Sequence, residues 1–372
     1  MVKKAYKYRF YPTDEQAELL AKTFGCVRFV YNQILRVRTD AYYQAQESIS
    51  YTGASAQLTQ LKKSEEAAWL NEVSSVPLQQ CLRNQQAAFS NFFAGRAKSP
   101  VFKKKTHKQS ATFTSAAFRY KDEQITIAKS KQPLNIKWSR GLPSTPSSIT
   151  ISKDFAGRYF VSCLCEFEPT LLPTNNKSIG IDVGITDITI TSDGNKSGNP
   201  RYTKKYATKL AFAQRKLSKK KLGSKNRLKA KVKVARIHAK ISDGRADFLH
   251  KKSTQYVNEN QVICVETLRI KNMVKNPKLA KHIADASWGE LIRQIEYKAL
   301  WYGRTLVKID QWFPSSKRCA CCGTIADKLP LEVRHWICPE CHTELDRDIN
   351  AAKNIRAEGL SVLAFGENVS LV

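Results

Sequence analysis

The chain has 372 residues, 42% of them hydrophobic, which is enough for two or three domains with cores of their own. Its 62 Lys and Arg against 32 Asp and Glu give a formal net charge of +30, and this excess favours nucleic acid as the partner because phosphates attract such a surface. No stretch approaches the ~20 apolar residues of a membrane-spanning helix, so composition excludes a membrane protein and we expect a cytoplasmic one.

The first hundred or so residues predict one strand followed by helices. Residues 3–13, KKAYKYRFYPT, alternate and are rich in Tyr and Phe, which predicts a strand. Thr13 or Asp14 then caps the first helix. The predicted helices cover about 14–46, 54–68 and 77–95. The basic, Pro-containing stretch at 96–109 predicts a loop or a domain boundary.

Between about residues 110 and 170 the apolar pattern changes to period two. This alternation predicts antiparallel strands in QITIAK, LNIKW and SITISKDFAGRYFVSCLCEFE, with a turn at Ala156 and Gly157. The strands indicate a small β unit that includes the first strand of the chain. The segment PTLLPTNNK at 169–177 then predicts a linker to a further region.

That region combines buried strands with a long basic stretch. SIGIDVGITDITITSDGNK predicts two strands around a tight turn at Asp193 and Gly194. From Arg201 to Ile241 there are 16 Lys and Arg and no acid, which predicts a helix or a helical hairpin that contacts nucleic acid. The remaining predicted elements are a strand in QVICVETLRI, a helix over 287–303, a strand over 304–312 and a weakly structured tail.

Two Cys-x-x-Cys pairs predict a structural zinc site. Cys319 and Cys322 form one pair, Cys338 and Cys341 the other, and fifteen residues separate the pairs. Four thiolates at this spacing complete a tetrahedral set that suits one Zn²⁺ and leaves no place for a substrate. Cys321 is an additional thiol whose spacing fits less well, and the other cysteines are interpreted as buried thiols in a reducing compartment.

Three acids lie where a buried metal cluster needs them. Asp182 lies in the apolar run GIDVGIT, and Glu266 closes the apolar run VICVE. Each acid alone could be a strand-end carboxylate that faces solvent. Together with an acid at a helix start they suit divalent metal, because Mg²⁺ prefers carboxylate oxygens. Two Mg²⁺ would allow phosphodiester hydrolysis.

The segment LDRDINAAKNI, residues 345–355, offers two candidates for the third acid. In a helix that starts near residue 347, Asp348 shares a face with the apolar positions Ala351, Ala352 and Ile355. Asp348 is therefore the predicted metal ligand. Asp346 precedes the helix and is predicted to cap it.

These motifs resemble those of the TnpB family. The matching stretches are GIDVGI, VETL, FPSSKRCACCG with CPEC, DRDINAAKNI and the start YKYRFYPTDEQAELLAKTFGCVRFVYNQIL. TnpB proteins are RNA-guided nucleases of bacterial insertion-sequence transposons, related to type V CRISPR effectors. The resemblance implies an RNA-guided DNA endonuclease that cuts beside a short transposon-adjacent motif, with Asp182, Glu266 and Asp348 as its Mg²⁺-binding catalytic triad.

The resemblance also implies a fold of mixed α+β and α/β domains. Its parts would be a wedge β-barrel domain (1–10 and 110–172), a helical recognition domain (11–109), a RuvC-like nuclease domain of RNase H fold (173–314 and 344–372) and a zinc-ribbon insertion (315–343). The implied partners are a guide RNA from the transposon end and double-stranded target DNA, with one protein chain per RNA. Its implied place of action is the bacterial nucleoid.

The implied DNA and RNA contacts can be named by residue. By resemblance, the candidates for reading the adjacent motif are Tyr51, Ser55, Ser75, Gln79 and Thr114. The candidates for holding the nucleic-acid backbone are Lys103, Lys104, Lys105, Lys219, Lys220, Lys221 and Arg227. In each case the alternative is an ordinary surface or packing role.

Three other functions remain open at this point. The chain could be an RNA-guided repressor that has lost cleavage, which the three intact acids argue against. It could be a protein-only transposase or resolvase, although the separate N-terminal half and the large positive charge favour an RNA partner. A zinc-ribbon DNA-binding protein without chemistry is the weakest of the three.

Overall fold

The protein is described by a computed structural model of residues 2–330 and 332–365. The chain forms two compact units, residues 1–168 and 169–372, each with a hydrophobic core of its own. The end of the predicted tail, residues 366–372, lies outside the described residues. None of the described helices is long and apolar enough to cross a membrane.

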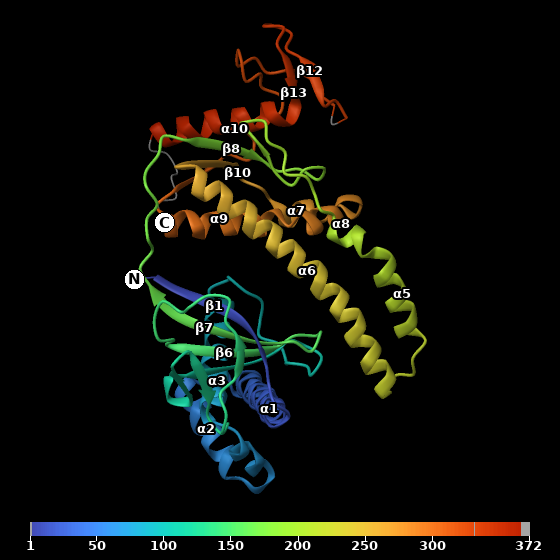
Figure 1. The fold of residues 1–372 in the computed structure, drawn as a ribbon. Coiled ribbons are helices and arrows are strands. Elements are labelled where there is room, and N and C mark those ends of the chain that lie inside the picture. The colour runs from blue at the N-terminus through green and yellow to red at the C-terminus, as the bar shows by residue number, and fades with distance from the viewer. Residues whose placement is uncertain (1, 331, 366–372) are drawn as a thin grey trace. The chain divides into compact units, whose positions relative to one another are not determined.

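The first unit is built on a five-stranded antiparallel sheet (Figure 1). Its strand order is β2 (Gln109–Thr114), β6 (Ser148–Lys153), β7 (Tyr159–Phe167), β1 (Val2–Tyr11) and β5 (Asn135–Lys137). Along β1 the alternate residues Tyr6, Tyr8 and Phe10 are buried, as the period-two pattern predicts. Since β2 and β5 are at opposite edges, the hydrogen bonding described gives an open sheet instead of the barrel that the resemblance implies.

Helices cover the rest of the first unit, together with a separate hairpin. The helical elements are α1 (Asp14–Ala45), α2 (Tyr51–Lys63), η1 (Glu65–Glu72), α3 (Ser75–Phe93) and η2 (Ser115–Ala117), and the hairpin is β3 (Phe118–Lys121) with β4 (Gln124–Ile127). Thr13 and Gln16 form a capping box at α1. The α2 and α3 helices begin earlier than predicted because Ser50 and Ser74 cap them.

The second unit contains a four-stranded sheet in the order β11 (Thr305–Ile309), β10 (Val262–Glu266), β8 (Ser178–Asp182) and β9 (Ile190–Thr191). The strands β8, β10 and β11 are parallel, and β9 is antiparallel to β8. The carboxyl ends of β8 and β10 therefore meet at one edge of the sheet, where ligands of open α/β sheets bind. Asp182 and Glu266 are the last residues of these two strands.

Helices pack on both faces of this sheet (Figure 1). On one face Ile181 and Val265 share a core with α6 (Lys225–Glu259) and α9 (Trp288–Tyr302). On the other face Cys264 and Val307 share a core with Ile355 of α10 (Arg347–Ala364). This second face is unusually close to its helix.

Two glycines permit the close approach of α10. A Cβ atom on Gly180 of β8 would lie 2.0 Å from the carbonyl oxygen of Ala352, and one on Gly359 would lie 2.4 Å from the sulfur of Cys264. Neither position can take a larger side chain unless the helix moves. Gly180 therefore fixes the distance from α10 to β8, which ends in Asp182, and Gly359 fixes the distance from α10 to β10, which ends in Glu266.

The remaining elements of the second unit are short or project from the sheet. They are α4 (Tyr202–Lys205), α5 (Ala207–Ser218), α7 (Ile270–Met273), α8 (Pro277–Ala286) and the two-stranded ribbon of β12 (His335–Ile337) and β13 (Glu344–Asp346). The basic stretch forms α4, α5 and the first part of α6, so α5 and α6 make a helical hairpin, one of the two forms predicted.

Candidate active site and metal centre

Three carboxylates come together at the carboxyl edge of the second sheet. The neighbouring residues Ile181 and Val265 are in register, so Asp182 and Glu266 follow side by side at the ends of β8 and β10. Asp348 lies in the first turn of α10. Burial, and after it the negative charges of Glu266 and Asp348, raise the pKa of Asp182 to about 7. The acids are thus close enough to repel one another.

Asp346 and Asp348 have different roles, as the helix geometry predicts. One Asp346 oxygen accepts hydrogen bonds of 3.0 Å from the backbone N–H groups of Asp348 and Ile349, which confirms it as the N-cap of α10. Its other oxygen pairs with Lys196 Nζ at 2.7 Å. The Asp348 side chain instead lies close enough to Asp182 to raise the pKa of that acid.

Two further side chains hold the acids in place, and the sequence did not reveal them. The buried Ser315 hydroxyl donates to Glu266 Oε1. Burial raises the pKa of Glu266, and this hydrogen bond opposes part of the shift. Arg334 Nη1 donates to both Asp348 oxygens, at 3.1 and 3.4 Å. The motif SSKRC contains the first of these residues, whereas no sequence pattern marks Arg334.

This arrangement fits a hard divalent cation. The three carboxylates lie near one another, and the pKa of Asp182 is strongly raised. A bound cation would reduce the repulsion between them by neutralising their negative charge. Among the described residues, their oxygens are not gathered as tightly as the four cysteine sulfurs, the one set found with all ligand atoms within 4.8 Å. Ions held here would keep water ligands, as Mg²⁺ usually does.

The four predicted cysteines form a compact cluster. The sulfur of Cys319 lies 3.6 Å from that of Cys341, and the sulfur of Cys322 lies 3.5 Å from that of Cys338. Their sulfurs could hold a metal ion. Gly323 has φ +82°, which supports the predicted tight turn after the first pair. Cys321 is exposed and lies outside the cluster.

Asparagines of α10 attach the cysteine region to the helix that carries Asp348. The backbone N–H of Ala320 donates to Asn350 Oδ1 at 2.8 Å, and Asn350 Nδ2 donates to the Arg318 carbonyl at 2.7 Å. One turn later, Asn354 Nδ2 donates to the Ser315 carbonyl at 2.8 Å. Both asparagines are buried, so the loop before the first cysteine pair is fixed against α10.

Comparison with known proteins identifies the family. Family profiles match residues 1–47 ("Helix-turn-helix domain"), 162–277 ("Probable transposase" of the IS605 OrfB type) and 288–355 ("Cas12f1-like, TNB domain"). A Streptomyces pristinaespiralis protein named "Putative RNA-guided DNA endonuclease" is 53% identical over 371 residues, 99% of this chain and 92% of its own length. The chain belongs to the TnpB family.

Two more similarities agree with this assignment to the TnpB family. The Escherichia coli K12 protein "Putative RNA-guided DNA endonuclease InsQ" is 29% identical over 98% of this chain and 94% of its own length. The solved structure of a Cas12f1–sgRNA–target DNA complex has a TM-score of 0.55 and 14% identity, and covers 95% of this chain and 98% of that one. At this identity the similarity shows a shared fold alone. Within the profile named helix-turn-helix, residues 2–47 form β1 and α1.

The five residues predicted to read the adjacent motif lie on neighbouring elements of this TnpB protein. Tyr51 and Ser55 are in the first turns of α2, and Ser75 and Gln79 are in the first turns of α3. The two helices pack together, with Arg83 over the Tyr51 ring at 4.7 Å. Thr114 ends β2, which packs against α3. Their role in reading DNA stays a prediction.

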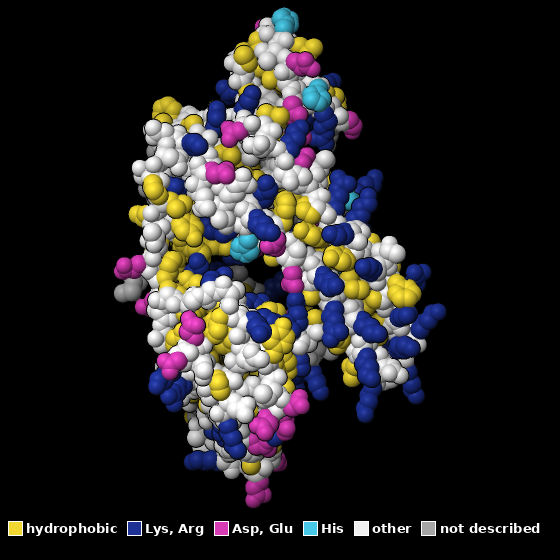
Figure 2. Space-filling model, viewed as in Figure 1, with side chains coloured by type: hydrophobic (Ala, Val, Ile, Leu, Met, Phe, Trp, Pro, Cys, Tyr) yellow, Lys and Arg dark blue, Asp and Glu magenta, His cyan; other side chains and the backbone are white. Residues whose placement is uncertain are grey.

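The residues predicted to contact the nucleic-acid backbone fall into two groups. Exposed side chains are Lys104, Lys105, Lys219, Lys220 and Lys221. Figure 2 shows Lys and Arg gathered over the α5 and α6 hairpin that carries the last three. Lys103 and Arg227 instead make contacts within the protein. Lys103 Nζ lies 4.2 Å from the centre of the Tyr31 ring, and Arg227 donates to the carbonyls of Leu217 and Lys220 in the hairpin turn.

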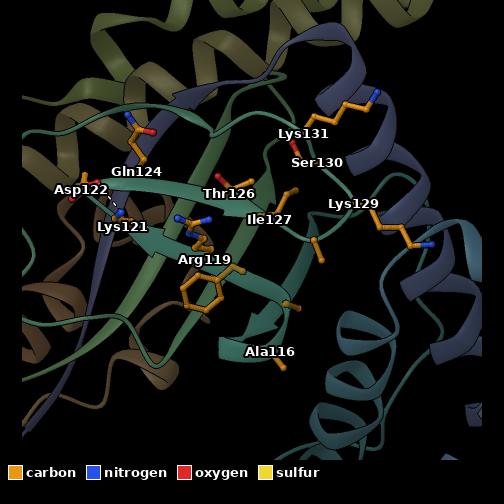
Figure 3. Close-up of a pocket in the computed structure, with 13 residues that line it drawn as sticks. Ala116, Arg119, Lys121, Asp122, Gln124, Thr126, Ile127, Lys129, Ser130 and Lys131 are labelled. Carbon is orange, nitrogen blue, oxygen red and sulfur yellow. Dashed lines mark ion pairs between the residues drawn. The ribbon is translucent and has the colours of Figure 1, made fainter.

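An open pocket lies beside the β3 and β4 hairpin of the first unit (Figure 3). Its charged and polar lining comprises Arg119, Lys121, Asp122, Gln124, Thr126, Lys129, Ser130 and Lys131. Lys129 also donates to the Asn71 carbonyl at 2.5 Å. The lining is mainly positive but contains no cluster of acids, so the three acids of the second unit stay the candidate active site.

Proposed function

We propose that the chain is an RNA-guided DNA endonuclease of an insertion-sequence transposon, which cuts target DNA beside a short transposon-adjacent motif. The observation that carries the proposal is 53% identity, across 99% of the chain, to a Streptomyces relative whose name carries this activity. The three acids at one sheet edge support it, because metal-dependent phosphodiester hydrolysis needs a carboxylate site of this kind.

The proposed division of labour follows the predicted domains. Residues 1–10 with 110–172 would form the wedge domain, and 11–109 the recognition domain. Residues 173–314 with 344–372 would form the RuvC-like nuclease domain, into which the zinc ribbon 315–343 is inserted. The guide RNA would read sequence by base pairing, while the positive charge of the protein holds the nucleic-acid backbones.

In the proposed mechanism Asp182, Glu266 and Asp348 would hold Mg²⁺. The bound metal would supply an activated water and charge stabilisation of the leaving oxygen in phosphodiester hydrolysis. Asp182 must lose its proton to bind, against a pKa of about 7 in the metal-free protein. Ser315 fixes the rotamer of Glu266, and Arg334 orients Asp348. These contacts preorganise the carboxylates, which is what a metal-dependent nuclease requires.

Zn²⁺ has a separate, structural role in this proposal. Cys319, Cys322, Cys338 and Cys341 would fill its tetrahedral sphere, so no coordination position would remain for substrate. Because Asn350 and Asn354 bind the neighbouring loop, an ordered ribbon also supports the start of α10. The zinc site would thus contribute to cleavage only by holding the start of α10 in position, without contacting the substrate.

Two alternatives use the same fold differently. An RNA-guided repressor without nuclease activity would bind the same partners, but the three intact acids favour cleavage. A protein-only transposase or resolvase would need no RNA, and the charge of +30 together with the separate N-terminal unit favours an RNA partner.

Sequencing the nucleic acid that copurifies with the protein tests the proposal. The expected result is one RNA species that ends in sequence matching DNA next to the gene's own transposon end. Recovery of only random RNA fragments, or of none, would favour the protein-only transposase. A specific RNA in a complex that binds matching DNA but never cuts it would favour the repressor.

A further inference from the structure

The ends of α1 and α3 expose an unusual number of aromatic rings. The two helices run in the same direction. Gln85 of α3 donates to the carbonyl of Tyr31 in α1, and closer to the C-terminal ends of both helices Arg38 of α1 donates to Gln86 of α3. Exposed rings at their C-terminal ends are Tyr42 (49%), Tyr43 (77%), Phe92 (38%) and Phe93 (74%), and the segment after α3 adds Phe102 (51%), whose neighbour Lys103 is hydrogen-bonded to Asn32 of α1. Here we name this set the aromatic end. So many exposed rings in one region indicate a binding surface.

Some rings at the aromatic end are stacked on side chains that lie deeper in the unit. The Arg38 guanidinium lies over the Phe89 ring at 5.4 Å. Phe89 and Phe93 are 6.3 Å apart with ring planes within 22° of parallel. One helical turn beyond Arg38 and Phe89 come Tyr42 and Phe93 on the same faces of their helices. The outermost ring, Phe93, thus continues a stack that begins in the core.

The segment after α3 adds positive charge to these rings. Residues 94–108 carry six Lys and Arg and no acid. Lys104 and Lys105 are exposed, while Lys103 is packed over Tyr31. Burial lowers the pKa of both Lys103 and Arg38. Within residues 2–330 and 332–365, no salt bridge joins a carboxylate to the buried Arg38 or to the half-buried Lys103.

We propose that the aromatic end is a stacking platform for unpaired bases of the guide RNA, with the cations of residues 94–108 bound to its phosphates. This inference rests on the proposed function. Aromatic rings next to Lys and Arg are what single-stranded nucleic acid requires, because bases stack on the rings and phosphates pair with the cations. RNA is favoured over a displaced DNA strand because, under the proposed function, the guide stays bound to the protein, whereas a displaced DNA strand is present only while target DNA is bound.

A second copy of the chain fits this surface less well. Dimerisation through the aromatic end would bring two segments of six cations each face to face, and like charges at an interface oppose association. The nearest acid on α1, Asp40, already pairs with Arg36 at 3.5 Å. The local charge therefore favours a polyanion as the occupant.

Crosslinking locates the contact directly. The full-length protein, stripped of nucleic acid at high salt, is irradiated with a 4-thiouridine RNA of about 12 nucleotides, a length that spans a typical single-strand site. We expect crosslinked peptides that contain Phe92, Phe93 or Phe102. Crosslinks confined to other parts of the chain would overturn the inference, and so would equal crosslinking here by a thiothymidine DNA of the same length.

Substitutions separate stacking from charge. F93A with F102A should weaken binding of the same RNA about 10- to 100-fold, the cost of one or two lost stacks, without changing the salt dependence. F93W should restore binding. K104A with K105A should instead lower the salt slope, by about 0.7 per lost phosphate contact. The matched control is F155A, because Phe155 is an exposed ring (60%) elsewhere in the same unit.

The outcomes distinguish this inference from the proposed function. A specific copurified RNA together with wild-type affinity in F93A/F102A would reject the platform and leave the RNA-guided nuclease intact. If the double variant changes the sedimentation of the nucleic-acid-free protein from dimer to monomer, the occupant is a second copy and the inference is wrong. Absence of any specific RNA would reject the proposed function itself.

Discussion

Ser315 acts on the proposed metal site through a single hydrogen bond to Glu266. Because Glu266 ends a parallel strand, its backbone is fixed, and the remaining freedom lies in its side chain. The Ser315 hydroxyl removes that freedom and stabilises the ionised carboxylate that a metal needs. It is therefore a positioning residue and not a ligand.

S315A should weaken metal binding about 10-fold, the usual cost of losing a partner that orients a ligand. Equilibrium Mn²⁺ binding followed by electron paramagnetic resonance measures this without relying on cleavage. S315T, which keeps the hydroxyl, should restore affinity, and S316A at the adjacent serine is the matched control. Equal losses in S315A and S316A would contradict the assignment.

Asp182 makes the metal-free protein less stable as pH rises. Its carboxyl loses a proton near pH 3.8 when unfolded but only near pH 7 in the fold, so between these values the folded state binds more protons and loses stability with rising pH. D182N removes this effect. In buffer free of Mg²⁺, it should match wild type near pH 4 and melt roughly 10 °C higher near pH 8, because a pKa change from 3.8 to about 7 corresponds to about 4 kcal/mol.

Calorimetry of both proteins across this pH range measures the difference. Added Mg²⁺ should stabilise wild type and reduce the difference in melting temperature from D182N, because the ion replaces the proton at Asp182. A constant difference between D182N and wild type at every pH would show that Asp182 ionises normally in the fold.

At the residue scale, sequence patterns predicted those features that depend on local helix geometry. Helical periodicity separated Asp348 from Asp346, and the observed hydrogen bonds confirm Asp346 as the cap. Arg334 could not be predicted, because it reaches Asp348 only after the ribbon folds back on α10. Neither could the internal contacts of Lys103 and Arg227, because runs of basic residues do not say which member turns inward.

At the scale of elements, α10 and β8 form the unit that sets the geometry of the proposed site. The absence of a side chain at Gly180 lets α10 lie directly on the strand. Any displacement of the helix would move Asp348 relative to Asp182. Misplacement by about 1 Å costs roughly 100-fold in rate in enzymes, so the packing matters for chemistry as well as stability.

G180A should therefore reduce DNA cleavage by about 100-fold although all three acids are still present in the chain. Initial rates on a matched plasmid substrate give the effect. The control is G141A, where an added Cβ would meet no atom within 4 Å. A G180A protein that cleaves at the wild-type rate would show that α10 is not held as described.

Most helices and strands could be predicted from periodicity, but the residues at which they begin and the pairing of distant strands could not. The caps Ser50 and Ser74 extend α2 and α3 toward the N-terminus beyond the apolar stripes used for prediction. The pairing of β1 with β7 joins residues about 150 or more positions apart, from Phe10 with Tyr159 to Val2 with Phe167, and such pairing is decided by tertiary packing.

At the scale of the whole molecule, the ribbon connects a zinc site to the proposed nuclease site. Ser315 and Arg334, which contact two of the acids, both belong to the 315–343 insertion. Loss of zinc should therefore disturb the acids without removing any of them.

C322S should lose about one equivalent of Zn²⁺ and most DNA cleavage, because the cluster closes only with four thiolates. Metal analysis by mass spectrometry together with the cleavage assay checks both parts. C321S is the matched control, since the Cys321 thiol is exposed and outside the cluster. Zinc retained by C322S and lost by C321S would show that the ligand set is wrong.

The central claim is tested most directly by cleavage of plasmid DNA that matches the copurified RNA, with Mg²⁺ present. Wild type should cut it beside the adjacent motif, while D182A and D348A should bind RNA and DNA but cut none. D346A should keep cleavage and lose about 1 kcal/mol of helix stability. Full-rate cutting by D182A and D348A, or a wild-type RNA complex that cuts no matching DNA, would contradict the account.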